Sequence, residues 1–306
     1  MKSRILKRLK EDNGIISGRQ LSDELEISRV SIWKHIQKLQ EMGYPIVSTA
    51  KGYRLRHCPD LLYPWEFPDR ESQIHYHHEV GSTMDVARDL ARSGCPHFSV
   101  VISEKQKNGR GRLKRPWLSS KGGLYFTVVI RPEIPPVLSP LLNFSAAVAM
   151  VQTLNEQHQL NAQVKWPNDI LVSGRKLAGI LSVMEAEGDL VTYVNIGIGI
   201  NVNNDPTKKE PNATSLRKEL AKSVSRQRLL SGFLKRFEEK SKTETVTGII
   251  TEWKQHAATL NRPVRVVTHN EVFEGVAVDV DDSGALIVKD KNDALQKIVC
   301  GDCFQT

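Results

Sequence analysis

Apolar residues in the first 43 positions recur with the spacing of three short helices. In each stretch a leucine or isoleucine returns every three or four residues, which places these side chains along one face of an α-helix. They are Ile5, Leu6, Leu9, Leu21, Leu25, Ile32, Ile36 and Leu39. Gly14 favours the end of the first helix, and Ser28 is suited to cap the start of the third. The spacing therefore predicts three helices, with a tight turn between the second and the third.

A β-hairpin is predicted directly after these helices. The segment 44–56, YPIVSTAKGYRLR, contains two short β-type runs around Gly52, a pattern that indicates a hairpin. Three helices followed by a hairpin resemble the winged helix-turn-helix domains of bacterial regulators. The resemblance implies that Gly18 to Gln37 form the DNA-binding motif, with the third helix in the major groove. The residues that it places against DNA are Arg29, Ser31, Lys34 and His35.

Positive charge is concentrated in the same segment. The chain has 306 residues and a formal net charge of +8, and residues 1–58 contain 12 Lys and Arg against 6 Asp and Glu, which gives this segment a charge of +6. A basic excess confined to one small unit favours a polyanionic partner such as DNA. The alternative is a three-helix packing domain with a solvated basic face, but the helix spacing, the hairpin and the charge together favour DNA binding.

The remaining chain divides into a connector and two further domains. Residues 59–73 begin with three prolines in ten positions, which disfavours regular structure and indicates a linker. Residues 74–258 alternate apolar strand-like runs with helical segments, as in a mixed α/β domain. Residues 259–306 contain alternating strands around a turn at 282–284, which indicates a small β domain. The predicted fold class is α+β, with a winged helix-turn-helix domain at residues 1–58.

The central domain contains a basic, glycine-rich loop. Ser82 is suited to cap a helix, with Asp85 completing a capping box. After the next strand, the segment from Gly109 to Trp117 (GRGRLKRPW) holds two glycines and four basic residues in nine positions. Such a segment is a poor helix or strand interior, so we expect a mobile surface loop that closes over an anionic ligand. Its spacing differs from the familiar phosphate-loop and dinucleotide motifs.

Polar residues interrupt the apolar runs that follow this loop. In a plain sheet they would be costly to bury unless they were paired or met a ligand. They are Lys165, Asn168, Asp169, Lys176 and Asn201. These positions are therefore candidates for the walls of a binding site, whereas the nearby Gly197 and Gly199 can serve close packing alone.

Four motifs in this region closely resemble those of the biotin protein ligases. In chain order they are GRGRLKRPW (109–117), VKWPNDILV (164–172), GRKLAGIL (174–181) and IGIGINVN (196–203), preceded by GST (81–83). With the winged helix in front, the chain resembles the bifunctional members that also repress a biotin operon. The resemblance implies a central domain of the biotin/lipoyl ligase type and a C-terminal SH3-like β-barrel. The related lipoyl ligases share the fold but lack GRGRxxRxW and the DNA-binding domain.

The resemblance also implies an ATP-dependent ligase that forms a carbon–nitrogen bond. Such an enzyme joins the biotin carboxylate to the α-phosphate of ATP, releases pyrophosphate, and passes biotin from biotinyl-5'-AMP to one lysine of a biotin carboxyl carrier protein, releasing AMP. The carrier belongs to acetyl-CoA carboxylase or a related carboxylase. Cations and Mg²⁺ should stabilise the charge that develops on phosphate. A homodimer formed on ligand binding would place two recognition helices on operator DNA.

The matching positions imply a role for each candidate site residue. Lys176 is expected to bridge carboxylate and phosphate, and catalysis is expected of Lys176, Arg110, Arg112 and Lys165. The residues expected to bind biotin are Ser82, Thr83, Met84, Gln106, Arg110, Gly111, Arg112 and Lys176. Those expected to bind ATP or the adenylate are Arg110, Arg112, Trp117, Asn168 and Asn201, with Asp169 as the Mg²⁺ ligand. In the simpler alternative, Asn168 braces a turn and Asp169 caps the site.

Met84 departs from the family pattern. The family usually has Asn after the Ser-Thr pair, so Met84 removes an amide that would help to fix the biotin ring, and we expect altered affinity rather than a different substrate. Two further hypotheses are a non-catalytic, biotin-sensing regulator and a ligase whose winged helix no longer binds DNA. The first would require loss of the basic loop or of Lys176, and both are present.

Export and membrane signals are weak along the whole sequence. No stretch approaches the about 18 consecutive apolar residues of a membrane span, and charges run through the first 14 residues, so a cytoplasmic protein is expected. Four cysteines are too few for a disulfide framework in a chain of this length. Cys300 and Cys303 form a C-x-x-C, but they lack a second pair with zinc-like spacing and no role is assigned to them.

Overall fold

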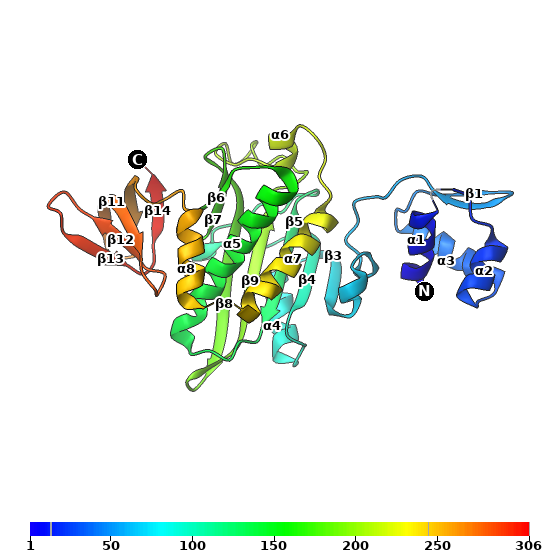
Figure 1. Cartoon of the computed structure of the whole chain (residues 1–306), viewed down its shortest axis with the longest axis horizontal. Coiled ribbons are helices and arrows are strands. Elements are labelled where there is room, and N and C mark those ends of the chain that lie inside the picture. The colour runs from blue at the N-terminus through cyan, green and yellow to red at the C-terminus, as the bar shows by residue number, and fades with distance from the viewer. Residues whose placement is uncertain (13, 244, 306) are drawn as a thin grey trace. The chain divides into compact units, whose positions relative to one another are not determined.

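The chain folds into two compact units, Met1–Ser72 and Gln73–Thr306, each described by itself. The structure is a computed structural model, and it describes residues 1–12, 14–243 and 245–305. Figure 1 shows the first unit in blue and the second in cyan to red.

The first unit has the three helices and the hairpin that the sequence predicts. Its elements are α1 (Lys2–Glu11), α2 (Gly18–Leu25), α3 (Arg29–Glu41), β1 (Ile46–Thr49) and β2 (Gly52–Leu55). Ser28 caps α3, since its side chain accepts a hydrogen bond from the backbone N–H of Ser31. The predicted apolar residues of all three helices are buried in one core together with Tyr44 and Ile46. The helix-turn-helix and wing predictions are therefore confirmed.

The segment expected to be a linker packs largely against this first core. It forms two short 3-10 helices, Pro64–Glu66 and Pro68–Gln73. Three of its side chains contact the core, namely Leu61, Tyr63 and Trp65. The buried carboxylate of Glu66 accepts hydrogen bonds from Lys10 Nζ at 2.7 Å and from Tyr44 Oη at 2.5 Å. The segment contains no long helix or strand, as its prolines predict. Burial of the apolar side chains between the prolines still stabilises the packing of the segment on the first core.

The second unit is built on a seven-stranded mixed sheet. Its strands are β3 (Ile74–Val80), β4 (Ser99–Gln106), β5 (Leu124–Ile130), β6 (Ala162–Lys165), β7 (Asp169–Val172), β8 (Arg175–Glu187) and β9 (Leu190–Ile200). The spatial order is β3-β4-β5-β9-β8-β7-β6, in which β3 and β4 run parallel and the other neighbours run antiparallel. The motif GRKLAGIL (174–181) lies largely on β8, and IGIGINVN (196–203) begins in the long strand β9, so the two motifs lie on one β8–β9 hairpin.

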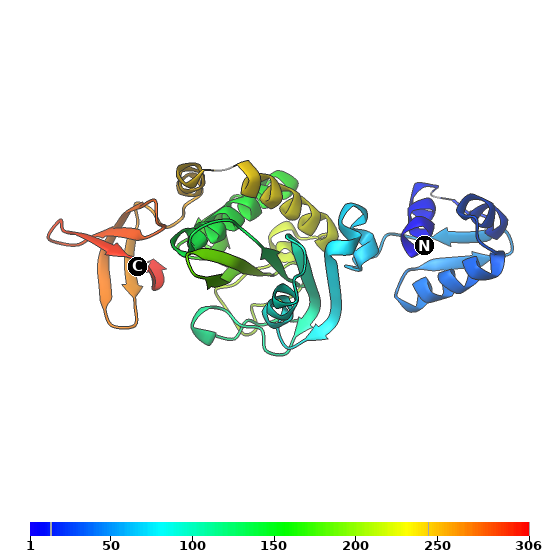
Figure 2. The ribbon, with the colours of Figure 1, turned by 90° about the horizontal axis from the view of Figure 1, so that it is seen from below.

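Helices cover both faces of this sheet (Figure 2). They are α4 (Thr83–Arg92) on one face and α5 (Ser139–His158), α7 (Arg226–Thr243) and α8 (Val246–Gln255) on the other; the short α6 (Leu216–Leu220) follows β9 in the chain. Val101 and Val129 pack against α4. Phe126 on the opposite side contacts Phe233 of α7, with ring centroids 5.4 Å apart. Alternating side chains along each strand thus fill two cores.

One helical segment within the described residues, Pro136–His158, is long and apolar enough to cross a membrane by length and composition alone. Most of its apolar stretch is buried inside the unit. The helix α5 within it is therefore the core helix of this domain, covered by α7 and α8.

The C-terminal β domain is an antiparallel sheet of five strands. They are β10 (Pro263–Val267), β11 (Val272–Val280), β12 (Leu286–Lys289), β13 (Leu295–Ile298) and β14 (Asp302–Gln305), in the order β13-β12-β11-β10-β14. Among the described residues β13 and β14 do not pair with each other, so the sheet stays open and the expected closed barrel is not observed. A barrel requires hydrogen bonds between its first and last strands, and these two edge strands are only four residues long.

Candidate active site

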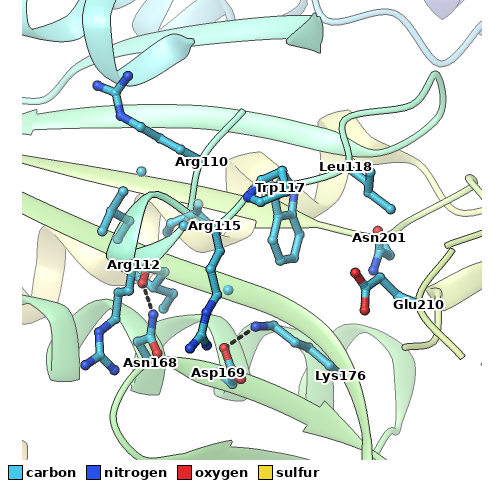
Figure 3. Close-up of a pocket in the computed structure, with 18 of the residues that line it drawn as sticks. Arg110, Arg112, Arg115, Trp117, Leu118, Asn168, Asp169, Lys176, Asn201 and Glu210 are labelled. Carbon is cyan, nitrogen blue, oxygen red and sulfur yellow. Dashed lines mark hydrogen bonds and ion pairs between the residues drawn. The ribbon is translucent and has the colours of Figure 1, made fainter. Parts of the chain in front are cut away.

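A cavity of about 450 Å³ lies over the β8–β9 hairpin, between the start of α4 and the basic loop 109–117. Figure 3 shows the side chains that surround it. Of the expected site residues, it is lined by Ser82, Thr83, Met84, Gln106, Arg110, Gly111, Arg112, Trp117, Asn168, Asp169, Lys176 and Asn201. Four separate sequence motifs therefore meet in one place.

Glycines form the floor of this cavity. Gly179 on β8 and Gly199 on β9 are directly paired across the hairpin. A Cβ atom on Gly199 would lie 2.4 Å from Nε1 of Trp117, and one on Gly197 would lie 2.5 Å from Sδ of Met84. A side chain at Gly199 would displace Trp117, and one at Gly197 would displace Met84. The glycines of the IGIGIN motif therefore let these two residues contact the strand backbone directly.

One end of the cavity is a neutral hydrogen-bonding pocket. Oε1 of Gln106 accepts hydrogen bonds from the backbone N–H of Thr83 at 2.8 Å and from Thr83 Oγ1 at 3.1 Å. Thr127 donates to Thr83 Oγ1 at 2.9 Å, and Nε2 of Gln106 donates to Ser119 Oγ at 3.0 Å. These bonds fix the orientation of the Gln106 amide and of the Thr83 hydroxyl. The result is a pocket of fixed donors and acceptors without formal charge.

The predicted capping box at α4 does not form. Ser82 is the N-cap and its hydroxyl accepts from the backbone N–H of Met84 at 3.3 Å. Asp85 instead binds the guanidinium of Arg110 in a bidentate manner, at 2.9 Å and 2.6 Å. The hydrogen bonds from Arg110 lower the pKa of Asp85 below its ordinary value. A strong charged partner thus outcompetes the local backbone N–H for this carboxylate.

Arg110 anchors the basic loop to Asp85, and its expected contacts with biotin and the adenylate stay predictions. It lines the cavity, but its guanidinium binds Asp85 on α4 and points away from the cavity (Figure 3). Arg112 donates to the carbonyl oxygen of Gly301 at 3.0 Å, and Arg115 forms an ion pair with Asp302. The loop that was expected to be mobile is therefore tied to α4 at its start and to the turn before β14 in its second half.

Lys176 lines the cavity from the start of β8, three residues before Gly179. Its Nζ is 2.6 Å from Oδ1 of Asp169 and 5.5 Å from the centre of the Trp117 ring. Its backbone N–H donates to the carbonyl of Asn212 at 3.0 Å, and its carbonyl accepts from Thr214 N–H at 2.8 Å. The Lys176 side chain stays 39% exposed, so the backbone is fixed while the ammonium is accessible from the cavity.

The two asparagines expected to face adenine also brace the cavity wall. Nδ2 of Asn168 donates to the carbonyl of Ile180 at 2.7 Å, which is the bracing role weighed above as the simpler alternative. Oδ1 of Asn201 accepts from Nδ2 of Asn204 at 2.9 Å. Both side chains still line the cavity. Their geometry is therefore compatible with a ligand contact in addition to the structural one.

Lys165 is placed outside the cavity. It ends β6, opposite Asp169 in the strand register, and its charge acts on the thiol of Cys303 in the C-terminal sheet. Burial raises the pKa of that thiol to about 11, and the Lys165 charge opposes the shift. The structure therefore does not bring Lys165 together with the other expected catalytic residues.

Three charged residues of the cavity are absent from the site that the sequence predicted. They are Arg115, Glu210 and Asp302. Arg115 stands in the same basic run as Arg110 and Arg112, so the run itself was a usable signal. Glu210 and Asp302 carry no local signal, because they reach the cavity only through the loop after β9 and through the C-terminal sheet.

Metal ligands are sparse in the described part of the chain, where no three His, Cys, Asp or Glu side chains gather in a cluster that could hold a metal ion. Asp169 faces the cavity with one carboxylate. Mg²⁺ bound to ATP needs only one or two protein carboxylates, since phosphates and water complete its coordination. One oxygen of Asp169 pairs with Lys176 at 2.6 Å, so its second oxygen is the one that fits a nucleotide-bound Mg²⁺.

The expected DNA-contacting residues of α3 divide into two groups. Arg29 and Lys34 are exposed. Ser31 is half-buried and hydrogen-bonded to the hydroxyl of Ser28 at 3.0 Å. His35 is half-buried, its Nδ1 is buried, and burial lowers its pKa. The structure thus presents Arg29 and Lys34 to solvent but turns His35 toward the protein.

The Asp85–Arg110 pair leads to a prediction for the basic loop. Asp85→Asn should increase the rate of trypsin cleavage after Arg110, Arg112 or Lys114 about five-fold, the effect of losing about 1 kcal/mol from a partly exposed charged pair. Arg110 lowers the pKa of Asp85 in the folded protein below its ordinary value of 3.8. The stabilisation of the loop by this ion pair is therefore fully present above pH 3.8 and is lost only as the pH falls through the lowered pKa.

Initial cleavage rates at neutral pH, read by mass spectrometry, test this prediction. The matched control is Asp89→Asn, because Asp89 lies on the same helix and its carboxylate pairs with Arg88. Equal cleavage rates in the two variants would show that Asp85 does not anchor the loop.

Three family models match successive parts of the chain. Residues 2–54 match a helix-turn-helix (HTH) domain, residues 79–201 match the biotin/lipoate A/B protein ligase family, and residues 259–304 match the biotin protein ligase C terminal domain. Their order agrees with the arrangement that the sequence predicted.

Relatives along the full length carry the same description. The bifunctional ligase/repressor BirA of Bacillus subtilis (strain 168) is 36% identical over 305 residues, covering 95% of this chain and 94% of the relative. The bifunctional ligase/repressor BirA of Escherichia coli (strain K12) is 29% identical over 291 residues, covering 89% and 88%.

Solved structures agree with the fold of the second unit. The biotin protein ligase from Aquifex aeolicus in complex with biotin and ATP aligns with a TM-score of 0.66 at 24% identity, over 76% of this chain and 99% of that chain. The biotin protein ligase from Leishmania major in complex with biotinyl-5-AMP aligns with a TM-score of 0.54 at 25% identity, over 74% and 98%. The matched domains and the full-length relatives together show that the chain belongs to the biotin protein ligases of the biotin/lipoate A/B protein ligase family, with the domain order of the bifunctional ligase/repressors.

Proposed function

We propose that this protein is an ATP-dependent biotin protein ligase that is also a biotin-responsive transcriptional repressor. The observation that carries the enzymatic part is the cavity itself. It joins a neutral hydrogen-bonding pocket at Gln106 and Thr83 to a charged region that contains Lys176, Arg112 and Arg115. In this region Asp169 pairs with Lys176 and Asp302 pairs with Arg115. A ligand with an uncharged polar ring and a carboxylate, activated by a nucleotide phosphate, fits this order of groups.

The first step brings two anions together. An oxygen of the biotin carboxylate attacks the α-phosphorus of ATP, the bond to the β-phosphate breaks, and pyrophosphate leaves with the electron pair. Lys176 is proposed to bind both the carboxylate and the α-phosphate, because it lines the cavity and its side chain is 39% exposed; Arg112 and Arg115 line the same cavity. Fixed cations at the site of charge development stabilise the transition state without reorganising solvent. Bound to ATP, Mg²⁺ would add positive charge to the phosphates, and Asp169 would hold it.

The mixed anhydride that results must be kept from water. Trp117 packs on Gly199, and the loop that carries it is tied down at both ends by Asp85 and Gly301. Its indole Nε1 is buried and, within the described chain, has no hydrogen-bond partner, so it is available to an acceptor on the ligand. The covered cavity limits hydrolysis of the adenylate until an acceptor arrives.

The second step is acyl transfer to a carrier protein. The neutral amine of a lysine attacks the biotinyl carbonyl carbon, the carbon–oxygen bond to phosphate breaks, and AMP leaves. The amide nitrogen then loses its extra proton to solvent or to a nearby base. The carrier is proposed to be a biotin carboxyl carrier protein of acetyl-CoA carboxylase or a related carboxylase, as in the names of the ligases that resemble this chain.

The neutral pocket is proposed to hold the ureido ring of biotin. Thr83 and Gln106 offer donors and acceptors whose orientation is fixed by their mutual hydrogen bonds. Met84 is buried against Gly197 and lines the same pocket with a thioether. Since a thioether is a weak acceptor, we expect a changed affinity for biotin rather than a changed substrate.

Regulation is proposed to depend on the first unit. Its helix-turn-helix would bind operator DNA, and ligand binding would favour a homodimer that places two α3 helices on a palindromic site. The cytoplasm, where DNA and carrier protein are both present, is the proposed compartment. The five-stranded C-terminal sheet is proposed to be an open form of the SH3-like fold, on the ground of its strand number and antiparallel order.

Two alternatives make different predictions. A non-catalytic biotin sensor would bind biotin without forming the adenylate, although Lys176 and the basic loop are in place. A ligase with a relic winged helix would transfer biotin but would not bind DNA, although Arg29 and Lys34 are exposed on α3.

Lys176→Ala should abolish biotin transfer. Removing a fixed cation beside the reacting phosphate costs at least about 100-fold in rate. Purified protein is incubated with ATP, Mg²⁺, biotin and an apo biotin carrier domain, and the carrier is weighed by mass spectrometry, with lipoate as the parallel substrate.

The exposed Lys222→Ala serves as the control and should leave the rate unchanged. One added biotin, lost with Lys176→Ala, supports the ligase, whereas biotin binding without transfer by the unsubstituted protein would favour the sensor.

DNA binding should be strongly salt-dependent. Each phosphate contact contributes about −0.9 to the slope of log affinity against log salt, so Lys34→Ala should reduce the magnitude of that slope by about one for each recognition helix bound. Fluorescence anisotropy with promoter fragments upstream of biotin genes measures it, with Lys222→Ala as the control. Absence of binding at low salt, with biotin and ATP present, would favour the relic hypothesis.

A further inference from the structure

Two large apolar side chains stand on the outer face of α3. Val30 is 62% exposed and Trp33 is 49% exposed. In contrast, the apolar residues that hold α3 in the unit are buried, namely Ile32, Ile36 and Leu39. The fold therefore does not use Val30 or Trp33 for its core.

Helix geometry places these two residues at the centre of the face opposite the core. Successive residues turn by about 100°, so Val30, Trp33, Lys34 and Gln37 lie together on one side, at spacings of three, four and seven residues. All four are exposed. The buried Ile32 lies about 200° from Val30 by the same geometry. The outer face of α3 thus carries Val30 and Trp33, which we call the apolar pair, with Lys34 and Gln37 beside them.

The surroundings of this pair indicate the kind of partner. Arg29 and Lys34 are exposed next to it, and the first 58 residues have a net charge of +6. A cationic rim favours a polyanion over the apolar surface of another protein. In the major groove of DNA, the apolar group on the base edges is the 5-methyl of thymine, and apolar side chains contact it.

We propose that Val30 and Trp33 read thymine methyl groups in the major groove, so that this protein selects DNA with thymines at the positions that these two residues face. The exposed amide of Gln37, one to two turns further along the helix, is placed to bind adenine in the same region. Lys34 and Arg29 bind phosphate and supply affinity without sequence preference. The inference rests on the proposed DNA-binding function and names the base group that its recognition helix selects.

Replacing thymine with deoxyuridine removes only the methyl group and leaves base pairing intact. The full-length protein, with biotin and ATP present, is first used to select binding sites from random duplex DNA. Each thymine of the selected site is then replaced singly by deoxyuridine, and affinity is measured by fluorescence anisotropy. At the thymines that the apolar pair contacts, affinity should fall about four-fold per methyl group, as expected for burying one such group.

Variants of the apolar pair make the test specific. Val30→Ala and Trp33→Ala should weaken binding to the thymine-containing site and should each abolish the deoxyuridine effect at one position. Lys34→Ala should weaken binding at every site while the deoxyuridine effect remains. Val272→Ala, another exposed apolar residue but in the C-terminal sheet, is the matched control and should change neither. Because Val30 and Trp33 are exposed, unchanged ligase activity and circular dichroism should show that the variants fold.

The outcomes separate this inference from the proposed function. Salt-dependent DNA binding with no deoxyuridine effect at any thymine would overturn the methyl readout while leaving the repressor function in place. Equal losses on thymine and deoxyuridine sites in Trp33→Ala and Val30→Ala would overturn it as well. If these variants instead changed oligomeric state and left DNA affinity unaltered, the pair would be a protein contact. No DNA binding under any ligand condition would overturn both proposals.

Discussion

The bare backbone of the β8–β9 hairpin is the constraint on which the site depends. Gly179 and Gly199 face each other across the two strands, and Gly197 lies two residues earlier on β9. Because Gly199 and Gly197 have no Cβ atom, Trp117 contacts Gly199 and Met84 contacts Gly197 directly. A Cβ atom at either position would occupy the space that these side chains fill. The cavity exists because side chains from a helix and from a loop can approach the sheet directly.

The loop above this floor is held by residues from distant parts of the chain. Asp85 at the start of α4 binds Arg110, while Gly301 and Asp302 before and within β14 bind Arg112 and Arg115. The loop therefore closes the cavity only when the central sheet, α4 and the C-terminal sheet are all folded. This gives the C-terminal sheet a physical role in the site, and Trp166, which donates to the carbonyl of Gly284 at 3.0 Å, ties it further to the central domain.

Local patterns in the sequence were sufficient for the elements and for most of the cavity. Helical spacing located the three N-terminal helices, and the resemblance located twelve residues that line one cavity, eight of them within the four motifs. Long-range pairing was not predictable. Asp85 looked like a capping residue because its partner Arg110 is 25 residues away. Lys165 stands in a motif whose other polar residues line the cavity, and the motif does not reveal that Lys165 is not among the lining residues.

The same limit applies at α3 and at the C-terminal sheet. His35 has the spacing of an exposed residue, but packing within the unit buries its Nδ1. Val30 and Trp33 were overlooked because apolar residues are usually assigned to cores, and only the structure shows them outside. Alternating strands indicate a β-sheet but do not determine whether its edge strands meet.

The glycine floor can be tested by one substitution. Gly199→Ala should displace Trp117, since the new Cβ would lie 2.4 Å from the indole Nε1, and biotin-dependent pyrophosphate release should fall about 100-fold while the unfolding temperature changes little. Gly188→Ala, at the turn of the same hairpin, is the control: its φ of +59° makes the substitution strained, but the new Cβ would have no atom within 4 Å, so the rate should be retained. An unchanged rate of pyrophosphate release in Gly199→Ala would contradict the claim that close approach to this backbone forms the site.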